Sequence, residues 1–164
     1  MIDIKDHFID EKTNTDLFKF VLNSEFGWFF QDSVVDIQDG NYMFCHTFYN
    51  PENKINSGHF HIIQNIFLKK LPIKQLLRVK LNFYPRTDER IIHGFHTDYE
   101  GNHKVALYYL NTNNGQTVFE NKDIDGVNSV AQRMVIFNGN LRHSSTTCTD
   151  KQFRISLNIN YEQI

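Results

Sequence analysis

The stretch from residue 153 to residue 161 alternates between apolar and polar side chains, and this pattern constrains the fold more than any other. Successive side chains of a β-strand point to opposite faces, whereas a helix repeats every 3.6 residues, so the stretch predicts a strand. The apolar or aromatic positions are Phe153, Ile155, Leu157, Ile159 and Tyr161, and the polar positions are Arg154, Ser156, Asn158 and Asn160. One face of this strand therefore carries the polar chemistry.

Residues 76–84 repeat the alternation, and the polar faces of the two predicted strands allow two interpretations. In an ordinary antiparallel sheet, the polar face is exposed to solvent. In a jelly roll with N-terminal helices, the apolar face packs on the helices, and the polar face lines the interior and binds a ligand. For Arg154 and Ser156 we favour the second interpretation, because a pattern of metal ligands stands just upstream.

The remaining pattern predicts a mainly β protein, a jelly roll or double-stranded β-helix of the cupin-like kind with N-terminal helices packed on one sheet. Further strands are expected at 104–110, 116–120, 127–130, 133–137 and, from the alternation above, 153–161. Gly- and Asn-rich turns separate them, and short strands at this spacing suit two sheets closing around a pocket.

Two helices are expected before these strands, at 13–23 and 60–70. Thr13 or Thr15 would cap the first, and Pro72 would end the second. Residues 27–50 resemble irregular strand and loop. We therefore expect one domain over 1–164, with a helical and irregular support region at 1–72 and the jelly-roll core at 73–164.

Composition excludes several classes of function. The net charge is −2 with no long run of one sign, which argues against non-specific nucleic-acid binding. No stretch reaches the roughly 18 apolar residues of a membrane helix, and the first residues lack the apolar region of a signal peptide. Cys45 and Cys148 form no C-x-x-C pair and are expected to be reduced thiols. A cytoplasmic protein is the expectation.

His96, Asp98, His143 and Arg154 are the strongest candidates for chemistry. His96 and Asp98 form His-x-Asp, 44 residues separate Asp98 from His143, and Arg154 follows eleven residues after His143. On a strand, His96 and Asp98 would share a face. Two imidazoles and one carboxylate suit iron(II) and leave positions open, while a downstream arginine can hold the carboxylate of an oxo-acid. The set suggests an oxygen-activating enzyme.

The other histidines lack such a pattern. His59 and His61 fall where a helix begins, so we expect them at the surface or the edge of the core. His93 precedes His96 by three positions, which on a strand would place the two side chains on opposite faces.

The region from about residue 76 to residue 161 resembles the iron(II)- and 2-oxoglutarate-dependent dioxygenases. Within them it is most similar to the prolyl-4-hydroxylase-like branch and to small phage-encoded oxygenases of that branch. The matching segments are Asn82-Phe83-Tyr84-Pro85, His96-Thr97-Asp98, Leu107-Tyr108-Tyr109-Leu110-Asn111, Gly115-Gln116-Thr117, Arg142-His143-Ser144 and Arg154-Ile155-Ser156.

This resemblance implies a role for each matching residue. His96, Asp98 and His143 match the catalytic iron ligands. Arg154 matches the residue that pairs with the distal carboxylate of 2-oxoglutarate, and Ser156 lies at the small hydroxyl position beside it. Tyr84 and Tyr109 match tyrosines that help to hold this cosubstrate.

The implied reaction is hydroxylation of a C–H bond with Fe(II), 2-oxoglutarate and dioxygen, releasing succinate and carbon dioxide. The substrate would be a small molecule or a peptide, and a peptidyl proline is one candidate. Two alternatives remain: a non-catalytic cupin-like module that binds metal or a small ligand, and a structural protein that kept the fold and lost the activity. We also expect the loop at 85–95 to border the substrate entrance, although it could be an ordinary solvated connection.

Overall fold

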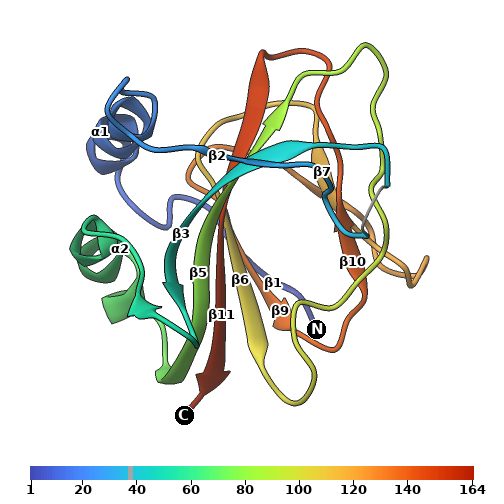
Figure 1. Ribbon diagram of the computed structural model, residues 1–164. Helices are drawn as coiled ribbons and strands as arrows, with labels where there is room; N and C mark the ends of the chain where they lie inside the picture. Colours follow the sequence, from blue (N-terminus) through green and yellow to red (C-terminus); the bar gives the residue numbers. More distant parts are fainter. Residues whose placement is uncertain (37–38) are drawn as a thin grey trace.

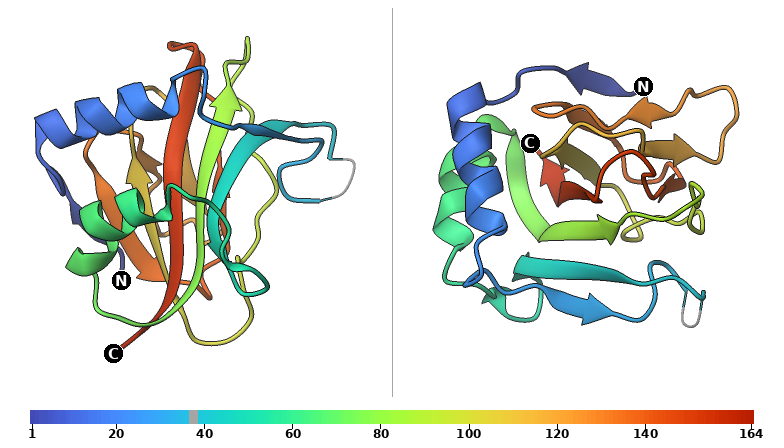
Figure 2. Two further views of the ribbon diagram at one scale, coloured as in Figure 1. Left: turned by 60° about the vertical axis from the view of Figure 1, so that its left-hand side comes forward. Right: turned by 90° about the horizontal axis from the view of Figure 1, so that it is seen from above.

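The computed structural model describes residues 1–36 and 39–164, and it consists of two antiparallel sheets with two helices on one side (Figure 1). The helices lie together against one face of the larger sheet, while the smaller sheet closes over the opposite face (Figure 2). Both the jelly roll and the helices packed on one sheet were expected from the sequence, and both are confirmed. Within the described residues, no helix is long and apolar enough to cross a membrane.

The larger sheet contains eight strands, and its centre is the pair formed by β5 (Ile73–Pro85) and β11 (Phe153–Gln163). The order is β1 (Asp3–Lys5), β9 (Met134–Asn138), β6 (Lys104–Tyr109), β11, β5, β3 (Met43–Asn50) and β2 (Phe29–Gln31), with β4 (Lys54–Ile55) paired to β3. Residues before Pro72 thus contribute strands at both edges of this sheet.

The register of β5 against β11 places their polar faces together. Arg154 lies opposite Tyr84, and Ser156 lies opposite Asn82. The pairs Asn158–Lys80 and Asn160–Arg78 follow. One continuous polar strip therefore runs along the centre of the sheet on the side that faces the smaller sheet.

The smaller sheet has the order β10 (His143–Ser145), β7 (Gln116–Phe119) and β8 (Val127–Asn128). Single bridges extend it, because Ile92 pairs with Thr146 and His96 pairs with His143. The chain that connects β5 to β6 is thereby tied to β10, which fixes the segment that carries two of the candidate metal ligands.

Helix α1 (Glu11–Val21) and helix α2 (Phe60–Ile66), which is followed by a 3₁₀ turn at Leu68–Lys70, match the expected positions. The predicted cap was wrong. Asp10 caps α1, because its carboxylate accepts hydrogen bonds from the Thr13 backbone N–H at 2.8 Å and the Thr13 hydroxyl at 2.7 Å. Either Thr or Asp can serve as a cap, so the pattern alone did not decide between neighbouring positions.

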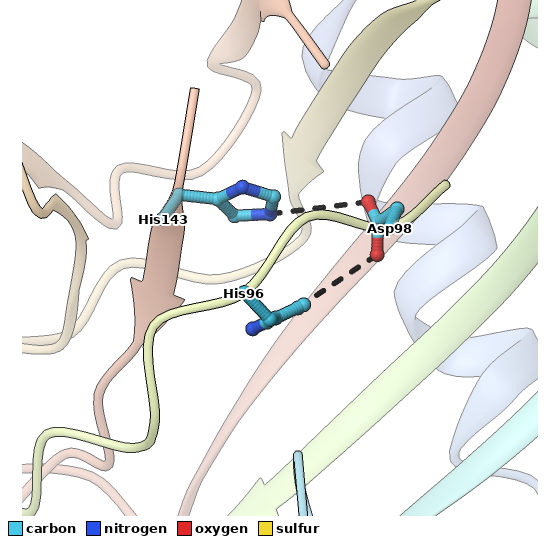
Figure 3. A group of neighbouring side chains, drawn as sticks. All are labelled: His96, Asp98 and His143. Carbon is cyan, nitrogen blue, oxygen red and sulfur yellow. Dashed lines mark ion pairs between the residues drawn. The ribbon is translucent and has the colours of Figure 1, made fainter. Parts of the chain in front are cut away.

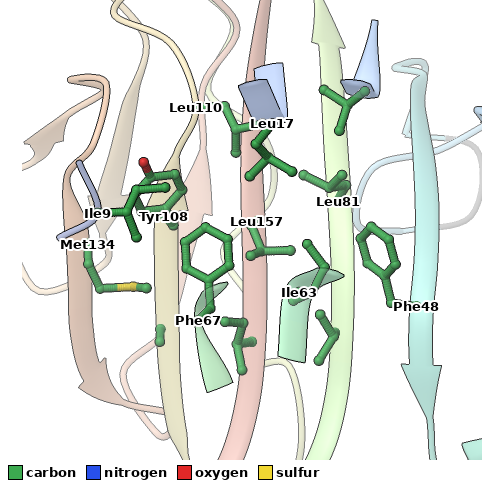
Figure 4. Packing of buried hydrophobic residues seen from close by; sticks show 14 of the residues in the cluster. Ile9, Leu17, Phe48, Ile63, Phe67, Leu81, Tyr108, Leu110, Met134 and Leu157 are labelled. Atoms are coloured by element: carbon green, nitrogen blue, oxygen red, sulfur yellow. The ribbon is translucent and has the colours of Figure 1, made fainter. Parts of the chain in front are cut away.

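Two apolar clusters flank the larger sheet. The first lies between the sheet and the helices, and it contains Leu157 and Leu81 from the sheet together with Leu17 and Ile63 from the helices (Figure 4). The second lies between the two sheets and includes Leu107 and Tyr109. The apolar face of β11 therefore packs on the helices, which confirms the interpretation that its polar face lines the interior of the roll.

Candidate metal centre and anion pocket

The side chains of His96, Asp98 and His143 converge (Figure 3). Their ligating atoms all lie within 4.8 Å of one another. Nε2 of His96 is 3.8 Å from Oδ1 of Asp98, and Nε2 of His143 is 3.8 Å from Oδ2 of Asp98. One transition metal can bridge such a set, with three positions of an octahedral shell left open.

The secondary-structure setting of this triad differs from the expectation. Only His143 belongs to a strand, β10, whereas His96 forms an isolated bridge and Asp98 lies in the loop that leads to β6. His96 and Asp98 therefore do not share a strand face. They meet because backbone hydrogen bonds of 3.0 Å in both directions join His96 to His143, and because Asp98 is drawn inward by donors on the central strands.

Three donors hold the Asp98 carboxylate. Arg78 of β5 donates to Oδ1 at 2.6 Å, while Asn158 and Asn160 of β11 donate to Oδ2 at 3.1 and 2.8 Å. Burial acts to raise the pKa of this carboxyl. The Arg78 charge, the neighbouring His143 and the two amide groups outweigh burial and hold its pKa well below the usual range. Asp98 is thus ionised and fixed in orientation, as a metal ligand must be.

Both histidines present the same ring nitrogen to the centre. Nδ1 of His96 lies 3.2 Å from the Gly94 carbonyl, and Nδ1 of His143 lies 3.0 Å from the Leu141 carbonyl. When Nδ1–H donates to a carbonyl, Nε2 keeps its lone pair for a metal. Burial also lowers the pKa of His143, which favours the neutral, ligating form.

Arg154 is the largest fully buried polar side chain, at 1% exposure. Its guanidinium donates to the Thr146 carbonyl at 3.4 Å and to the Thr117 hydroxyl at 3.2 Å, and Nε has no partner. Among the described residues, no acidic side chain lies within 4.0 Å of it. A buried cation without an anion is costly, by several kcal/mol, so the surroundings of Arg154 favour a negatively charged ligand.

The anion pocket connects Arg154 to the metal centre. It is lined by Asn82, Tyr84, His96, Leu107, Thr117, His143, Ser145, Arg154, Ser156 and Asn158. Tyr84 and Ser156 therefore lie where the sequence placed them, at the pocket wall. Tyr109 lies one step behind the wall: its hydroxyl donates to the Thr117 hydroxyl at 2.7 Å, and its ring is 5.3 Å from the guanidinium of Arg154.

Buried polar atoms without a partner follow the polar strip, and three of their residues, Asn82, Arg154 and Asn158, line the pocket. In the described part of the chain there are six such side-chain atoms, and five belong to the polar strip: Arg78 Nε, Asn82 Oδ1, Arg154 Nε, Asn158 Oδ1 and Asn160 Oδ1. Buried polar groups are rarely left unsatisfied in native proteins. The two arginine N–H donors and the three asparagine oxygen acceptors can therefore bond to a polar ligand or to ordered water.

His93 belongs to the wall behind Tyr84, which the sequence did not indicate. Its ring stacks on Tyr84 at 5.5 Å, and its Nδ1 lies 2.8 Å from the Ser145 hydroxyl. Burial, together with the charge of Arg154, lowers the pKa of His93 to about 4. His93 is thus neutral and contributes packing and a hydrogen bond, while its side chain does not join the metal centre.

The loop between Tyr84 and His96 divides into two parts. Residues near Ile91 and His93 pair with the chain that follows β10, and they line a cavity of about 90 Å³ together with Tyr42 and Thr147. The charged part is exposed, and Arg90 donates to the Asn114 carbonyl at 3.1 Å. A role for this loop in substrate entry stays a prediction.

Gly115 gives a direct test of the anion pocket. A Cβ at this position would lie 2.7 Å from Cδ of Arg154 and 3.1 Å from the Thr147 carbonyl. We expect Gly115→Ala to displace Arg154, to lower stability by about 1–3 kcal/mol through overpacking and to weaken binding of a dicarboxylate. Thermal unfolding and anaerobic titration of 2-oxoglutarate measure both effects. Gly58→Ala is the control, since nothing lies within 4 Å of its added Cβ.

Several contributors to the site escaped the sequence analysis. The sequence did place Arg78, Asn158 and Asn160 on the polar faces of the two alternating stretches, which made them possible site residues. What the sequence lacked was the register that brings them to one carboxylate. Thr117 stood in a matching segment but had no role assigned, and it supports both Arg154 and Tyr109.

No protein-family model matches the chain, and no curated protein matches it. Solved structures do match. An oxidoreductase of the 2OG-Fe(II) oxygenase family from Burkholderia pseudomallei is 13% identical with a TM-score of 0.71, over 98% of this chain and 84% of that one. A Pseudomonas putida prolyl-4-hydroxylase is 14% identical with a TM-score of 0.69, over 99% and 92%.

A third similar structure is the non-heme alpha ketoglutarate dependent epimerase SnoN from nogalamycin biosynthesis, at 12% identity and a TM-score of 0.68, over 99% of this chain and 77% of that chain. At such identities the similarity establishes architecture. The chain therefore has the double-stranded β-helix fold found in 2-oxoglutarate-dependent oxygenases and prolyl hydroxylases.

Proposed function

We propose that this protein is an iron(II)- and 2-oxoglutarate-dependent dioxygenase that hydroxylates a C–H bond and releases succinate and carbon dioxide. One observation carries the proposal: a buried arginine without an acidic partner lines the same pocket as a convergent His–Asp–His set. The first feature fits a dicarboxylate and the second fits a divalent metal. A ligand that bridges both, as an oxo-diacid does, accounts for their proximity.

The residues divide the work as follows. His96, Asp98 and His143 hold the metal, which supplies the oxygen chemistry when bound. Arg154 binds the distal carboxylate of 2-oxoglutarate through its forked N–H groups, and Ser156 and Tyr84 offer hydroxyls along the wall. Tyr109 positions Thr117, which in turn orients Arg154. Leu107 contributes an apolar side chain to a pocket wall that is otherwise polar.

The substrate is proposed to be a small molecule or a peptide. A peptidyl proline is one candidate, because prolyl hydroxylases are among the similar structures. The fold also serves an epimerase, so the outcome at the substrate depends on groups at the mouth of the pocket rather than on the shared core.

The alternative is a cupin-like module that binds metal or a small ligand without catalysis. Metal storage alone would not require Arg154, whose burial without an anion is unfavourable. A module that binds a small anion without catalysis would use Arg154 as well, and release of succinate distinguishes it from the proposed enzyme.

A cytoplasmic location is proposed as well. Cys45 and Cys148 are both buried and free, and they form no disulfide. Reduced thiols of this kind are typical of proteins that work in a reducing compartment.

Metal dependence tests the proposed function. We expect the protein to bind 2-oxoglutarate under anaerobic conditions only after Fe(II) is added, and to release succinate once air is admitted. Removal of the metal with a chelator should abolish both signals, and Fe(II) should restore them. Calorimetry and mass spectrometry provide the measurements, with the exposed His61→Ala variant as the control. Metal-independent binding, or metal binding without any affinity for 2-oxoglutarate, would contradict the proposal.

A further inference from the structure

The polar strip between β5 and β11 carries more positive charge than the proposed reaction uses. Its inward-facing positions contain three cations, Arg78, Lys80 and Arg154, and no acid. Asp98 reaches the strip from its loop and contributes one negative charge. A metal dication and a doubly negative oxo-acid would cancel each other, so two positive charges would remain at the loaded site.

Two of these cations have an assigned partner. Arg154 faces the pocket proposed for the oxo-acid, and Arg78 bonds to Asp98 at 2.6 Å. Lys80 has none: in the part of the chain that the structure describes, no acidic group lies within 4.0 Å of its Nζ, and its ammonium makes no hydrogen bond. Asp98 does not pair with Lys80: its carboxylate accepts hydrogen bonds from Arg78, Asn158 and Asn160, and its remaining acceptor site is the one proposed for the metal.

The position of Lys80 is at the metal end of the strip. It lies opposite Asn158 on one side and opposite Thr47 of β3 on the other. Burial is the main cause that lowers the pKa of Lys80, Cys45 and Asp98 act to raise it, and Arg78 acts to lower it. Lys80 is only partly buried and does not line the anion pocket, and Asn158, which lies opposite it, donates to Asp98 at 3.1 Å, so Lys80 lies nearer to Asp98 along the strip than to Arg154.

We propose that Lys80 binds an anionic group of the substrate, a carboxylate or a phosphate, and thereby places the rest of that molecule beside the metal. The inference rests on the proposed function, whose substrate it narrows to anionic molecules. A flexible ammonium suits this task, because it can follow a point charge that differs in position from one substrate to another.

The test uses acetate and acetamide as probes, since they share a shape and differ in charge. The protein is loaded with Mn(II) and saturated with 2-oxoglutarate, and the relaxation of the probe's methyl protons is measured by NMR. We expect strong enhancement for acetate and little for acetamide. Lys80→Met should reduce the acetate enhancement about five-fold or more, as for loss of one ion pair, while Lys80→Arg should retain most of it.

Stability provides an independent readout. A partly buried ammonium without an anion opposes folding, so Lys80→Met should raise the melting temperature of the unliganded protein by about 2 °C or more. The exposed Lys69→Met variant is the control and should change neither measurement. A lower melting temperature for Lys80→Met would assign Lys80 to the fold and overturn the inference.

The remaining outcomes separate the two proposals. Equal enhancement for acetate and acetamide, or acetate enhancement that survives Lys80→Met, would overturn the role of Lys80 while leaving the dioxygenase proposal intact. If Lys80→Met also lost affinity for 2-oxoglutarate by about the same factor, Lys80 would be a cosubstrate-binding residue, and its proposed role in substrate binding would be overturned. Failure of the wild-type Mn(II) protein to bind 2-oxoglutarate would instead overturn the proposed function.

Discussion

Asp98→Asn is expected to abolish turnover of 2-oxoglutarate and to weaken metal binding by at least about 100-fold, since loss of groups that merely support a ligand already costs 10- to 100-fold. Asparagine preserves the size of the side chain but removes the negative charge that a divalent metal requires. The substitution also leaves Arg78 facing a neutral amide in place of the carboxylate it contacts at 2.6 Å. Metal titration of the chelator-treated protein measures the affinity directly.

Asp6→Asn is the matched control, because Asp6 also bonds to an arginine, Arg133, at 2.6 Å but lies outside the site. It should leave metal affinity and turnover unchanged. If Asp98→Asn bound Fe(II) nearly as tightly as the wild type, Asp98 would not be a ligand. The ion pair between Asp98 and Arg78 would then serve only to stabilise the fold.

The alternation of side chains predicted the strands well where the two faces differ in polarity. β5 and β11 were recognisable because one face packs on helices and the other lines a polar pocket. β3 falls within the irregular strand and loop expected at 27–50, but its bounds could not be predicted, because both of its faces contact apolar groups: Phe48 packs on the helical side, while Met43 and Cys45 lie with Tyr84 on the inner side. A strand that is apolar on both faces has no period-two signal.

The candidate site could also be predicted only in part, because some of its residues are recognisable along the chain and others depend on how distant strands pair. The order and type of His96, Asp98, His143 and Arg154 could be read along the chain. The donors that fix Asp98 could not, because they depend on which residue of β11 lies opposite Arg78. Register is set by packing over the entire sheet, and a shift of one residue would turn Asn158 and Asn160 away from the carboxylate.

Arg154→Met is expected to weaken binding of 2-oxoglutarate by roughly 30-fold to several thousand-fold, the equivalent of about 2–5 kcal/mol for loss of a buried charge-assisted pair. Metal affinity should change little, because Asp98 is held by Arg78, Asn158 and Asn160 and not by Arg154. Anaerobic calorimetry of the metal-loaded protein with 2-oxoglutarate separates the two affinities.

Two further variants sharpen this experiment. Arg154→Lys keeps the charge but loses the fork, so it should bind 2-oxoglutarate with an intermediate affinity. Arg133→Met removes an arginine that pairs with Asp6 at 2.6 Å outside the site, and it should bind 2-oxoglutarate as the wild type does. Equal 2-oxoglutarate affinity in Arg154→Met and the wild type would remove Arg154 from the cosubstrate site.

Arg154→Met should raise the melting temperature of the unliganded protein although it weakens the binding of 2-oxoglutarate. In the unliganded protein, Arg154 is a buried cation whose nearest contacts are two tyrosine rings, a hydroxyl and a carbonyl. These contacts compensate its desolvation only in part, so replacement by methionine of similar length should raise the melting temperature. After 2-oxoglutarate and metal are added, the wild type should have the higher melting temperature, because it gains a bound anion that the variant cannot hold. A side chain retained only for packing would show no such reversal.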